Sequence, residues 1–374
     1  MSGPGVSDHS TVAREGKSAA SGRNQEAHET GFVDFVIPFD PGRKATPGFS
    51  AVSFSCCVFD PCLPGQRVQC TRASDDFTFL QEEHASLSFS AAIPAGATGS
   101  DMNSGIAVII PVYNAVRALE LVLTGYCRQS SGGYEVFIAD DGSGPEVRTL
   151  VEAFARNASF TIRYVSQPDE GFRRSRILNQ AVRESAAKYL IFADADCVPH
   201  AHFVEAHCRR RGLRTVLCGR RVNLSEGISR RLTPGDILAG RLEHFSPARV
   251  FDVLLGRGGH WDEGMLLKNR ALHRLINYKE PTLLGCNFSL ERSLLEEING
   301  FNEDFVGYGG EDTELEYRLR LAGARFRWVR HLAIQYHLHH PLRAGNQQNL
   351  GILERTRAEG RAACRNGIRK DFQP

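Results

Sequence analysis

From residue 105 onward, short apolar runs alternate with stretches of helical periodicity, and this alternation constrains the fold more than any other feature. The runs that predict strands are IAVIIPV, YEVFIAD, TIRYVSQ, YLIFAD and TVLCGR, at residues 106–112, 134–140, 161–167, 189–194 and 215–220. Helical patterns lie between them, at 115–129, 145–156, 173–187 and 199–211. Strands that alternate with helices of this length indicate an α/β fold, with a doubly wound, mostly parallel sheet and helices on both faces.

Residues 1–104 differ in character and predict a poorly ordered N-terminal extension. They are rich in Ser, Ala, Gly and Pro and show no sustained period of a strand or a helix. Residues 1–101 carry 7 Lys+Arg and 12 Asp+Glu, a net charge of −5, whereas residues 102–374 carry 38 and 31, a net charge of +7. Met102 stands just before the first predicted strand. We therefore expect the functional protein to begin at or near Met102, with a small regulatory domain as the alternative.

Composition excludes several classes of protein. An excess of seven positive charges is far below that of a dedicated nucleic-acid binder, so no nucleic-acid partner is expected. No run reaches the roughly 18–20 apolar residues of a membrane helix, and the first residues lack the apolar centre of a secretory signal. The ten cysteines include no CxxC pair, which makes reduced thiols more plausible than structural zinc. These features predict a cytoplasmic protein.

Polar residues collect at the predicted carboxyl ends of three strands, where open α/β sheets bind their ligands. These ends are PVYN at 111–114, ADDGSG with Asp140 and Asp141, and DADC with Asp194 and Asp196. Each alone could be a solvated turn or a helix cap. Together they indicate a pocket whose carboxylates suit ribose hydroxyls, a base edge and a metal ion.

The two aspartates of YLIFADADCVPH need a counter-charge if they lie close together. Residues 194 and 196 point to the same side if the chain there is extended. No GxGxxG follows the first strand and no GxxxxGK[ST] occurs, so a nucleoside diphosphate would need another source of positive charge. A divalent cation held by carboxylates would supply it.

The motifs PVYN, DDGS, DEGFRRSRILNQA and DAD, in this order and spacing, resemble the family 2 inverting glycosyltransferases of the GT-A fold. Further on, LGCNFSLERSLLEEINGFNEDFVGYGGEDTELEYRLRLAG resembles the acceptor half of galactosyltransferase-like and chondroitin-polymerase-like enzymes. The resemblance implies a nucleotide-sugar-binding half at 105–220 and an acceptor-binding, catalytic half at 221–340. A basic helix or tail at 341–374 would follow.

On the donor side, the resemblance implies that Pro111, Tyr113 and Asn114 line a uracil and ribose pocket. Asp140 and Asp141 would lie beside it, with Asp141 at the base edge. Family members often have an arginine directly before the asparagine that corresponds to Asn179. Here that position is Leu178, and Arg173, Arg174 and Arg176 lie nearby. Arg176 is our choice among them, although the sequence leaves open which arginine faces the diphosphate.

For the metal, the resemblance implies that Asp196 is a ligand while Asp194 takes the ribose or sugar side. A histidine after the last strand commonly completes the coordination. The segment QYHLHH offers His337, His339 and His340, of which we choose His337. Because neutral imidazole suits Mn²⁺ better than Mg²⁺, Mn²⁺ is the expected cofactor and Mg²⁺ the alternative.

On the acceptor side, Glu311 and Asp312 end the GGED motif, where such families place acceptor contacts and the catalytic base. Acidic residues at this position could instead only cap the following helix, which is worth about 0.3–1 kcal/mol. The upstream strand-end carboxylates favour the catalytic interpretation. The remaining predicted acceptor residues are Asn287, Tyr308, Gly309 and Gly310.

Two basic, amphipathic segments stand outside these motifs. Residues 222–281 and the C-terminal segment 352–372 mix Arg and Lys with Leu and Ile at helical spacing. Helices packed on the core with a solvated basic face are the simplest interpretation. The alternative is an acceptor or membrane-surface patch, which would place the protein at the inner face of a membrane.

These features predict a metal-dependent, inverting glycosyltransferase. It would move a hexose or N-acetylhexosamine from a nucleoside diphosphate sugar, with UDP favoured, to a glycan or lipid-linked glycan such as lipopolysaccharide or capsule. A sugar nucleotidyltransferase shares the α/β plan but should carry a Gly- and Lys-rich loop after the first strand, and PVYNAVRALE has none. A non-catalytic nucleotide-sugar-binding protein would not need both acids of GGED, which are present.

Overall fold

The computed structural model describes residues 105–244, 255, 258–341, 345–370 and 372. The predictions made for residues 1–104, including a start at Met102, lie outside these residues.

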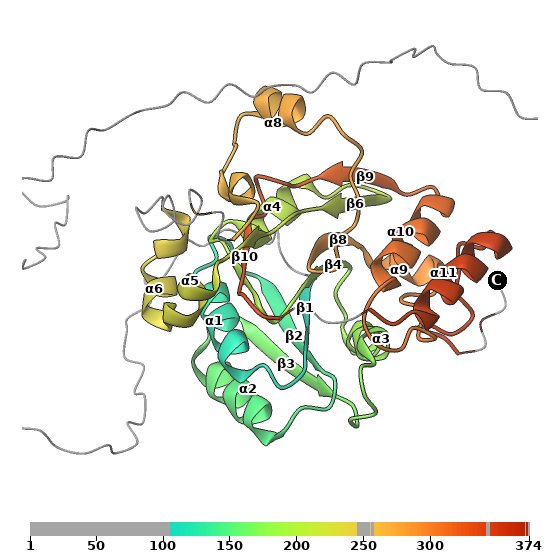
Figure 1. The fold of residues 1–374 in the computed structure, drawn as a ribbon, viewed down its shortest axis with the longest axis horizontal. Coiled ribbons are helices and arrows are strands. Elements are labelled where there is room, and N and C mark those ends of the chain that lie inside the picture. The colour runs from blue at the N-terminus through green and yellow to red at the C-terminus, as the bar shows by residue number, and fades with distance from the viewer. Residues whose placement is uncertain (1–104, 245–254, 256–257, 342–344, 371, 373–374) are drawn as a thin grey trace, which may run out of the picture. The chain divides into compact units, whose positions relative to one another are not determined.

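A seven-stranded sheet forms the centre of the described chain, in the order β3-β2-β1-β4-β8-β6-β9 (Figure 1). Neighbouring strands are parallel except at β8, which runs antiparallel to both β4 and β6. The predicted α/β class and mostly parallel sheet are therefore confirmed. The strands are β1 (Ile106–Val112), β2 (Tyr134–Asp140), β3 (Thr161–Ser166), β4 (Tyr189–Ala193), β6 (Thr215–Cys218), β8 (Asn287–Glu291) and β9 (Arg325–Trp328).

Helices cover both faces of this sheet. Successive side chains of each strand point to opposite faces, so an apolar strand needs a packing partner on each side. In β1, Ile106, Val108 and Ile110 belong to the core on one face, and Ala107 and Ile109 to the core on the other. Burial on both faces explains why β1, β4 and β6 are almost continuously apolar, whereas the edge strands β3 and β9 are partly exposed and carry polar residues. The first face packs against α1 (Val116–Tyr126), α2 (Pro145–Asn157) and α4 (Phe203–Arg210), the second against α3 (Arg174–Glu184), α9 (Arg292–Glu297) and α10 (Glu311–Leu321).

A second sheet of three short strands joins distant parts of the chain. The strand β10 (Gln335–His337) runs antiparallel to β5 (Cys197–Pro199) and parallel to β7 (Val222–Asn223). His337 stands opposite Cys197, and the backbone N–H of Leu338 donates to the carbonyl of Asp196 at 2.8 Å. The segment after β4 is thereby fixed against the end of β10.

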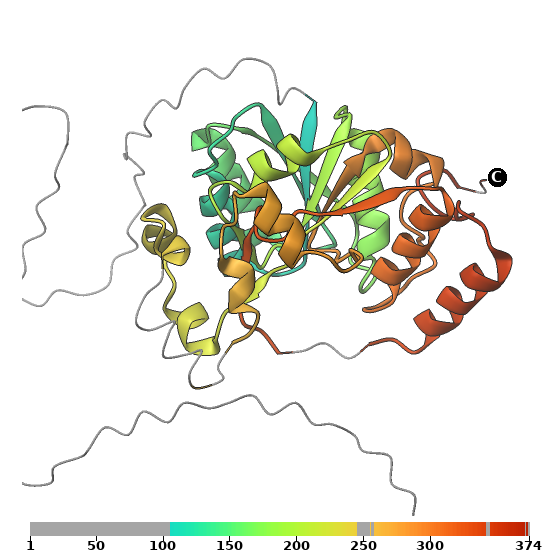
Figure 2. The same cartoon turned by 90° about the horizontal axis from the view of Figure 1, so that it is seen from above.

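The start of α10 is held by buried charge. Glu314 and Arg318 are each about 1% exposed and form an ion pair one turn apart, at 2.8 Å. Arg318 also donates to the carbonyls of Ile298 and Gly300. Breaking one side of such a buried pair costs about 3–5 kcal/mol, so the position of α10 is strongly determined. Helix α11 (Gln348–Glu359) lies beside α10 in both views (Figures 1 and 2), and its Thr356 hydroxyl donates to Glu314 at 3.2 Å.

The segment 222–281 forms the short elements α5 (Glu226–Arg231), α6 (Pro234–Leu238), η1 (Arg241–Glu243), η2 (Trp261–Gly264) and α8 (Arg270–Ile276). The sequence favoured helices that pack an apolar face on the core. Helix α8 does not do so, because Leu272, Leu275 and Ile276 are exposed and His273 is the buried residue. The spacing of apolar residues therefore predicted that this segment is helical, but it did not predict which side of the helix is buried. None of the helices in the described part of the chain has both the length and the apolar character of a membrane span.

Candidate active site

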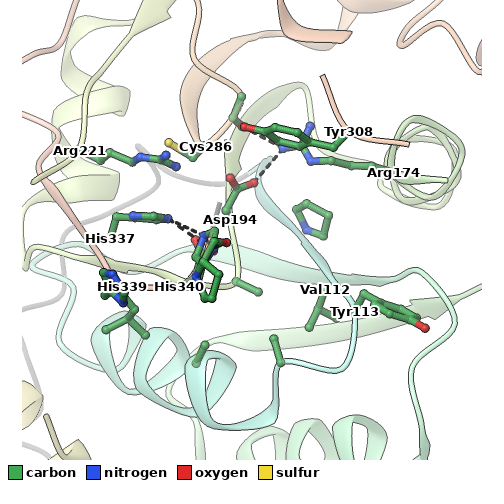
Figure 3. Close-up of a pocket in the computed structure, with 18 of the residues that line it drawn as sticks. Val112, Tyr113, Arg174, Asp194, Arg221, Cys286, Tyr308, His337, His339 and His340 are labelled. Atoms are coloured by element: carbon green, nitrogen blue, oxygen red, sulfur yellow. Dashed lines mark hydrogen bonds and ion pairs between the residues drawn. The ribbon is translucent and has the colours of Figure 1, made fainter. Parts of the chain in front are cut away.

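A cavity of about 770 Å³ opens at the carboxyl ends of β1, β2 and β4, where the strand pattern placed it (Figure 3). Its walls also include the chain before β8, the start of α10 and the segment after β10. Nine of the residues predicted for the site line this cavity: Pro111, Tyr113, Asp141, Asp194, Asp196, Tyr308, Glu311, Asp312 and His337.

One wall carries a compact group of metal-binding side chains. Asp196 Oδ2 lies 3.6 Å from His337 Nε2 and 3.3 Å from His340 Nε2, and the two imidazole nitrogens are 3.1 Å apart. His340 therefore joins the predicted pair, whereas the His339 imidazole is not part of this group. Figure 3 shows His337 and His340 converging on one point.

The donor set of this group fits a divalent transition-metal ion. Burial alone would raise the pKa of the Asp196 carboxyl, but hydrogen bonds from His337 and His340 outweigh it and lower that pKa below its usual range. An ionised carboxylate is thus available together with two imidazole nitrogens. One oxygen and two nitrogen ligands suit Mn²⁺ or Zn²⁺ better than Mg²⁺.

Arg174 connects the two sides of the cavity. Its guanidinium donates to Asp194 Oδ1 at 2.8 Å and to the carbonyl of Gly285 at 3.3 Å, and it lies 3.8 Å from Asp312 Oδ1. Arg174 is the first residue of α3, which aims its side chain into the cavity (Figure 3). The donor-side aspartate and the GGED aspartate therefore share one cation.

Asp312 has the properties of a proton acceptor. Burial, together with the nearby charges of Glu311 and Asp194, raises the pKa of its carboxyl to about 6, against the opposing effects of Arg174 and of the hydrogen bond from Gly285. Its Oδ2 accepts a hydrogen bond from the backbone N–H of Gly285 at 2.8 Å. Its Oδ1 is buried and accepts no hydrogen bond from any residue the structure describes. A carboxylate with one oxygen fixed by a hydrogen bond and the other oxygen without one can take a proton near neutral pH.

Glu311 is less available for chemistry. Its Oε2 accepts a hydrogen bond from the N–H of Gly309 at 2.9 Å, which closes the turn before α10. Gly310, with a φ of 92°, is the residue directly before the helix. Gly309 and Gly310 thus shape the turn, and neither lines the cavity.

The far side of the cavity is built by the ends of β1 and β2. Asp141 accepts hydrogen bonds from the Gln167 side chain and, at 2.8 Å, from the backbone N–H of Arg173. Burial raises the pKa of the Asp141 carboxyl. Tyr113 is 40% exposed, and its hydroxyl donates to Asp169 at 3.0 Å. An exposed ring beside a fixed carboxylate is suited to stacking and to pairing with a base edge.

Two predicted residues at the strand ends, Asn114 and Asp140, have structural contacts instead of facing the cavity. Asn114 accepts from the N–H of Gly144 and ties two strand-end loops together. Asp140 is fully buried and accepts from the N–H of Ser143 and the hydroxyl of Tyr164.

Asn287 is also fully buried, and its amide donates to the carbonyls of Arg220 and Ala333. Its side-chain oxygen lies 3.1 Å from His207 Nε2, so no side-chain group of Asn287 is left for an acceptor sugar. The choice of Arg176 is not supported either, since this arginine pairs with Glu170 at 2.7 Å outside the cavity lining.

Several cavity residues were missed by the sequence analysis. Gly285 and Cys286 lie directly before β8. No local sequence pattern predicted that β8 pairs antiparallel with β4. Arg221 lies three residues after the end of β6. A search of the residues that follow each strand, which had located the aspartates, would also have located Arg221.

Comparisons with known proteins agree with this geometry. Residues 107–298, more than half of the chain, match the family described as glycosyl transferase family 2. Residues 268–341 match the family described as the N-terminal domain of galactosyltransferase.

Curated relatives share the same region. A chondroitin synthase from Escherichia coli is 27% identical over 63% of this chain and 35% of its own length. A validoxylamine A glucosyltransferase from Streptomyces hygroscopicus subsp. jinggangensis is 30% identical over 58% of this chain and 52% of its own length. The match thus spans about a third to a half of these relatives.

Among solved structures, the mannosyltransferase PcManGT from Pyrobaculum calidifontis, in complex with GDP-Man and Mn²⁺, is similar with a TM-score of 0.43 and 17% identity. The match covers 64% of this chain and 58% of that one. On the match over residues 107–298, the chain belongs to glycosyl transferase family 2.

Proposed function

We propose that this protein transfers a hexose or N-acetylhexosamine from a uridine diphosphate sugar to a hydroxyl group of a cell-surface glycan, with inversion at the anomeric carbon. The observation that carries the proposal is Asp312. It has one oxygen fixed by Gly285 and the other without a hydrogen-bond partner among the described residues, on the cavity that also holds Asp196, His337 and His340.

Each wall of the cavity has a separate task in such a transfer. Tyr113 and Asp141 bind the nucleoside, the ring by stacking and the carboxylate by accepting hydrogen bonds from the base or ribose. Tyr308 is 47% exposed and packs edge-on against Phe172, which leaves its ring open to a sugar. Asp194, held by Arg174, accepts from sugar hydroxyls. The donor is thereby oriented before any bond changes.

The transfer itself is a single displacement. Asp312 takes the proton of the acceptor hydroxyl as its oxygen forms the new glycosidic bond, and the bond to the nucleoside diphosphate breaks on the opposite side of the sugar. General-base assistance of this kind contributes about 10²–10⁴-fold to the rate. One base suffices for this step, because no covalent sugar–enzyme intermediate forms.

Asp196, His337 and His340 would hold a divalent cation, for which Mn²⁺ is the proposed ion. When bound, such an ion neutralises charge on the diphosphate as it leaves. Support for a glycan acceptor comes from the relatives, which include a chondroitin synthase.

The proposal is tested by incubating the full-length protein with UDP-glucose, UDP-galactose, their N-acetylated forms and GDP-mannose. We expect Mn²⁺-dependent release of UDP from at least one UDP-sugar, and loss of that release in EDTA. Addition of a matching oligosaccharide acceptor should raise the rate, and nuclear magnetic resonance should show an inverted anomeric configuration in the product. Retention of configuration, or release from GDP-mannose alone, would contradict the proposal.

The raised pKa of Asp312 gives the reaction a defined pH dependence. Above pH 6 the carboxyl is ionised and can accept a proton, whereas below about pH 6 it becomes protonated and the base is lost. We expect kcat/KM to fall about tenfold for each pH unit below this value. Because acid also protonates imidazoles, UDP and Mn²⁺ binding must be measured at each pH. A kcat/KM that stays constant well below pH 6 while binding is intact would exclude Asp312 as the base.

A further inference from the structure

Arg221 lies on the cavity wall between β6 and β7, and the proposed function has not yet given it a task. Its side chain extends into the cavity beside Cys286, on the side where His337 lies (Figure 3). The residue is half-buried. Among the residues that the structure describes, none forms a hydrogen bond or an ion pair with its guanidinium.

The other arginines of the cavity are already occupied. Arg174 is bound to Asp194 and the carbonyl of Gly285. Arg117 donates to three carbonyls, those of Ser229, Arg230 and Leu232. The guanidinium of Arg230 is exposed and pairs with Glu226 at 2.6 Å. The guanidinium of Arg221 thus has all five of its N–H donors available for a ligand, whereas the other three arginines already use some or all of theirs.

The groups around Arg221 do not supply a matched counter-charge. The nearest carboxylates, Asp194 and Asp196, have partners of their own in Arg174 and the two histidines. A partly desolvated guanidinium without a direct partner is costly unless a ligand completes its hydrogen bonds.

The charge of the cavity indicates which group of the ligand would bind Arg221. Carboxylates line it from Asp141 to Asp312, and these would repel a nucleoside diphosphate. Positive charge must therefore meet the phosphates near Asp194 and Asp196, and Arg221 is the arginine at that place with free donors. We propose that Arg221 binds the diphosphate of the donor through paired hydrogen bonds and so holds the leaving group. This inference rests on the proposed function and adds to it a phosphate-binding residue.

The test is isothermal titration of uridine and of UDP into the full-length protein in Mn²⁺, for the parent and for Arg221→Met. Charge-assisted hydrogen bonds of this kind are worth about 10- to 100-fold in affinity. We expect Arg221→Met to weaken UDP binding by that factor and to leave uridine binding unchanged. Arg221→Lys keeps the charge but not the planar fork, so it should weaken UDP binding by less.

Arg230→Met is the matched control, because it removes one positive charge from the same cavity while its guanidinium is exposed and bound to Glu226. It should leave UDP affinity close to that of the parent. Equal UDP affinity in the parent and in Arg221→Met, or an equal loss for uridine and UDP, would overturn the inference. Failure of the parent itself to bind UDP would instead overturn the proposed function. If Arg221→Met does not fold, the loss specific to UDP must appear in Arg221→Lys.

Discussion

Replacement of Asp312 by asparagine is expected to lower kcat by about 10²–10⁴-fold, the usual contribution of a general base. Asparagine keeps the shape of the side chain and can still accept from the N–H of Gly285, the contact that now fixes Oδ2 at 2.8 Å. It cannot take a proton from the acceptor hydroxyl. The variant should therefore bind UDP and Mn²⁺ as the parent does and fail in the chemical step. Steady-state kinetics with saturating donor measures the loss, and titration of UDP verifies binding.

Glu311→Gln is the comparison that separates the two acids of GGED. Because Glu311 is held by the N–H of Gly309, a contact that glutamine can also accept, we expect this variant to lose far less activity than Asp312→Asn. If Glu311→Gln were the more damaged of the two, the base would be Glu311 and the assignment of Asp312 would be wrong. Thermal unfolding of both variants shows whether either loss comes from a disturbed α10.

Asp196→Ala is expected to abolish the dependence of UDP binding on a divalent cation. It removes the single carboxylate of the group that also contains His337 and His340, so that only the two neutral imidazoles remain to bind a cation. Loss of residues that only support metal ligands costs about 10–100-fold in metal affinity, so loss of a direct ligand should cost more than about 100-fold. Titration of Mn²⁺ and of UDP in Mn²⁺, with EDTA as the reference, measures both effects.

His339→Ala provides the control for this experiment. Its imidazole lies outside the group, although it belongs to the same segment and lines the same cavity. Manganese affinity should survive this change, whereas His337→Ala and His340→Ala should each reduce it. If UDP bound the parent equally well in EDTA, Asp196 would be a contact for the ligand itself and not for a metal.

Sequence reasoning located five of the seven strands of the main sheet, and β1, β2, β4 and β6 were marked by apolar runs because they are buried on both faces. It did not predict β9, whose residues are half-buried or exposed. It also located Asp141, Asp194 and Asp196, since strand ends meet at one edge of a parallel sheet. It could not foresee β8, whose antiparallel place between β4 and β6 depends on partners far away in the chain. The buried position of Asn287 at the start of β8 follows from that pairing.

The differences between the sequence analysis and the structure at single residues have geometric causes. Arg174 and Arg176 are two positions apart on α3, which turns their side chains to nearly opposite sides of the helix. Choosing between them required the position at which the helix begins. Likewise, an extended chain would have put His337 and His339 on one side. The strand β10 ends at His337, and the chain then turns so that His340 returns to Asp196.

The pairing of β10 with β5 also sets which genetic changes this site can survive. Asp196 and His337 meet because His337 is in register with Cys197, and side chains alternate with a period of two. Loss or gain of one codon just before β10 would shift that register by one residue and turn His337 away from Asp196, even with every ligand still encoded. We therefore expect homologous chains to vary in residue type through this segment far more readily than in its length.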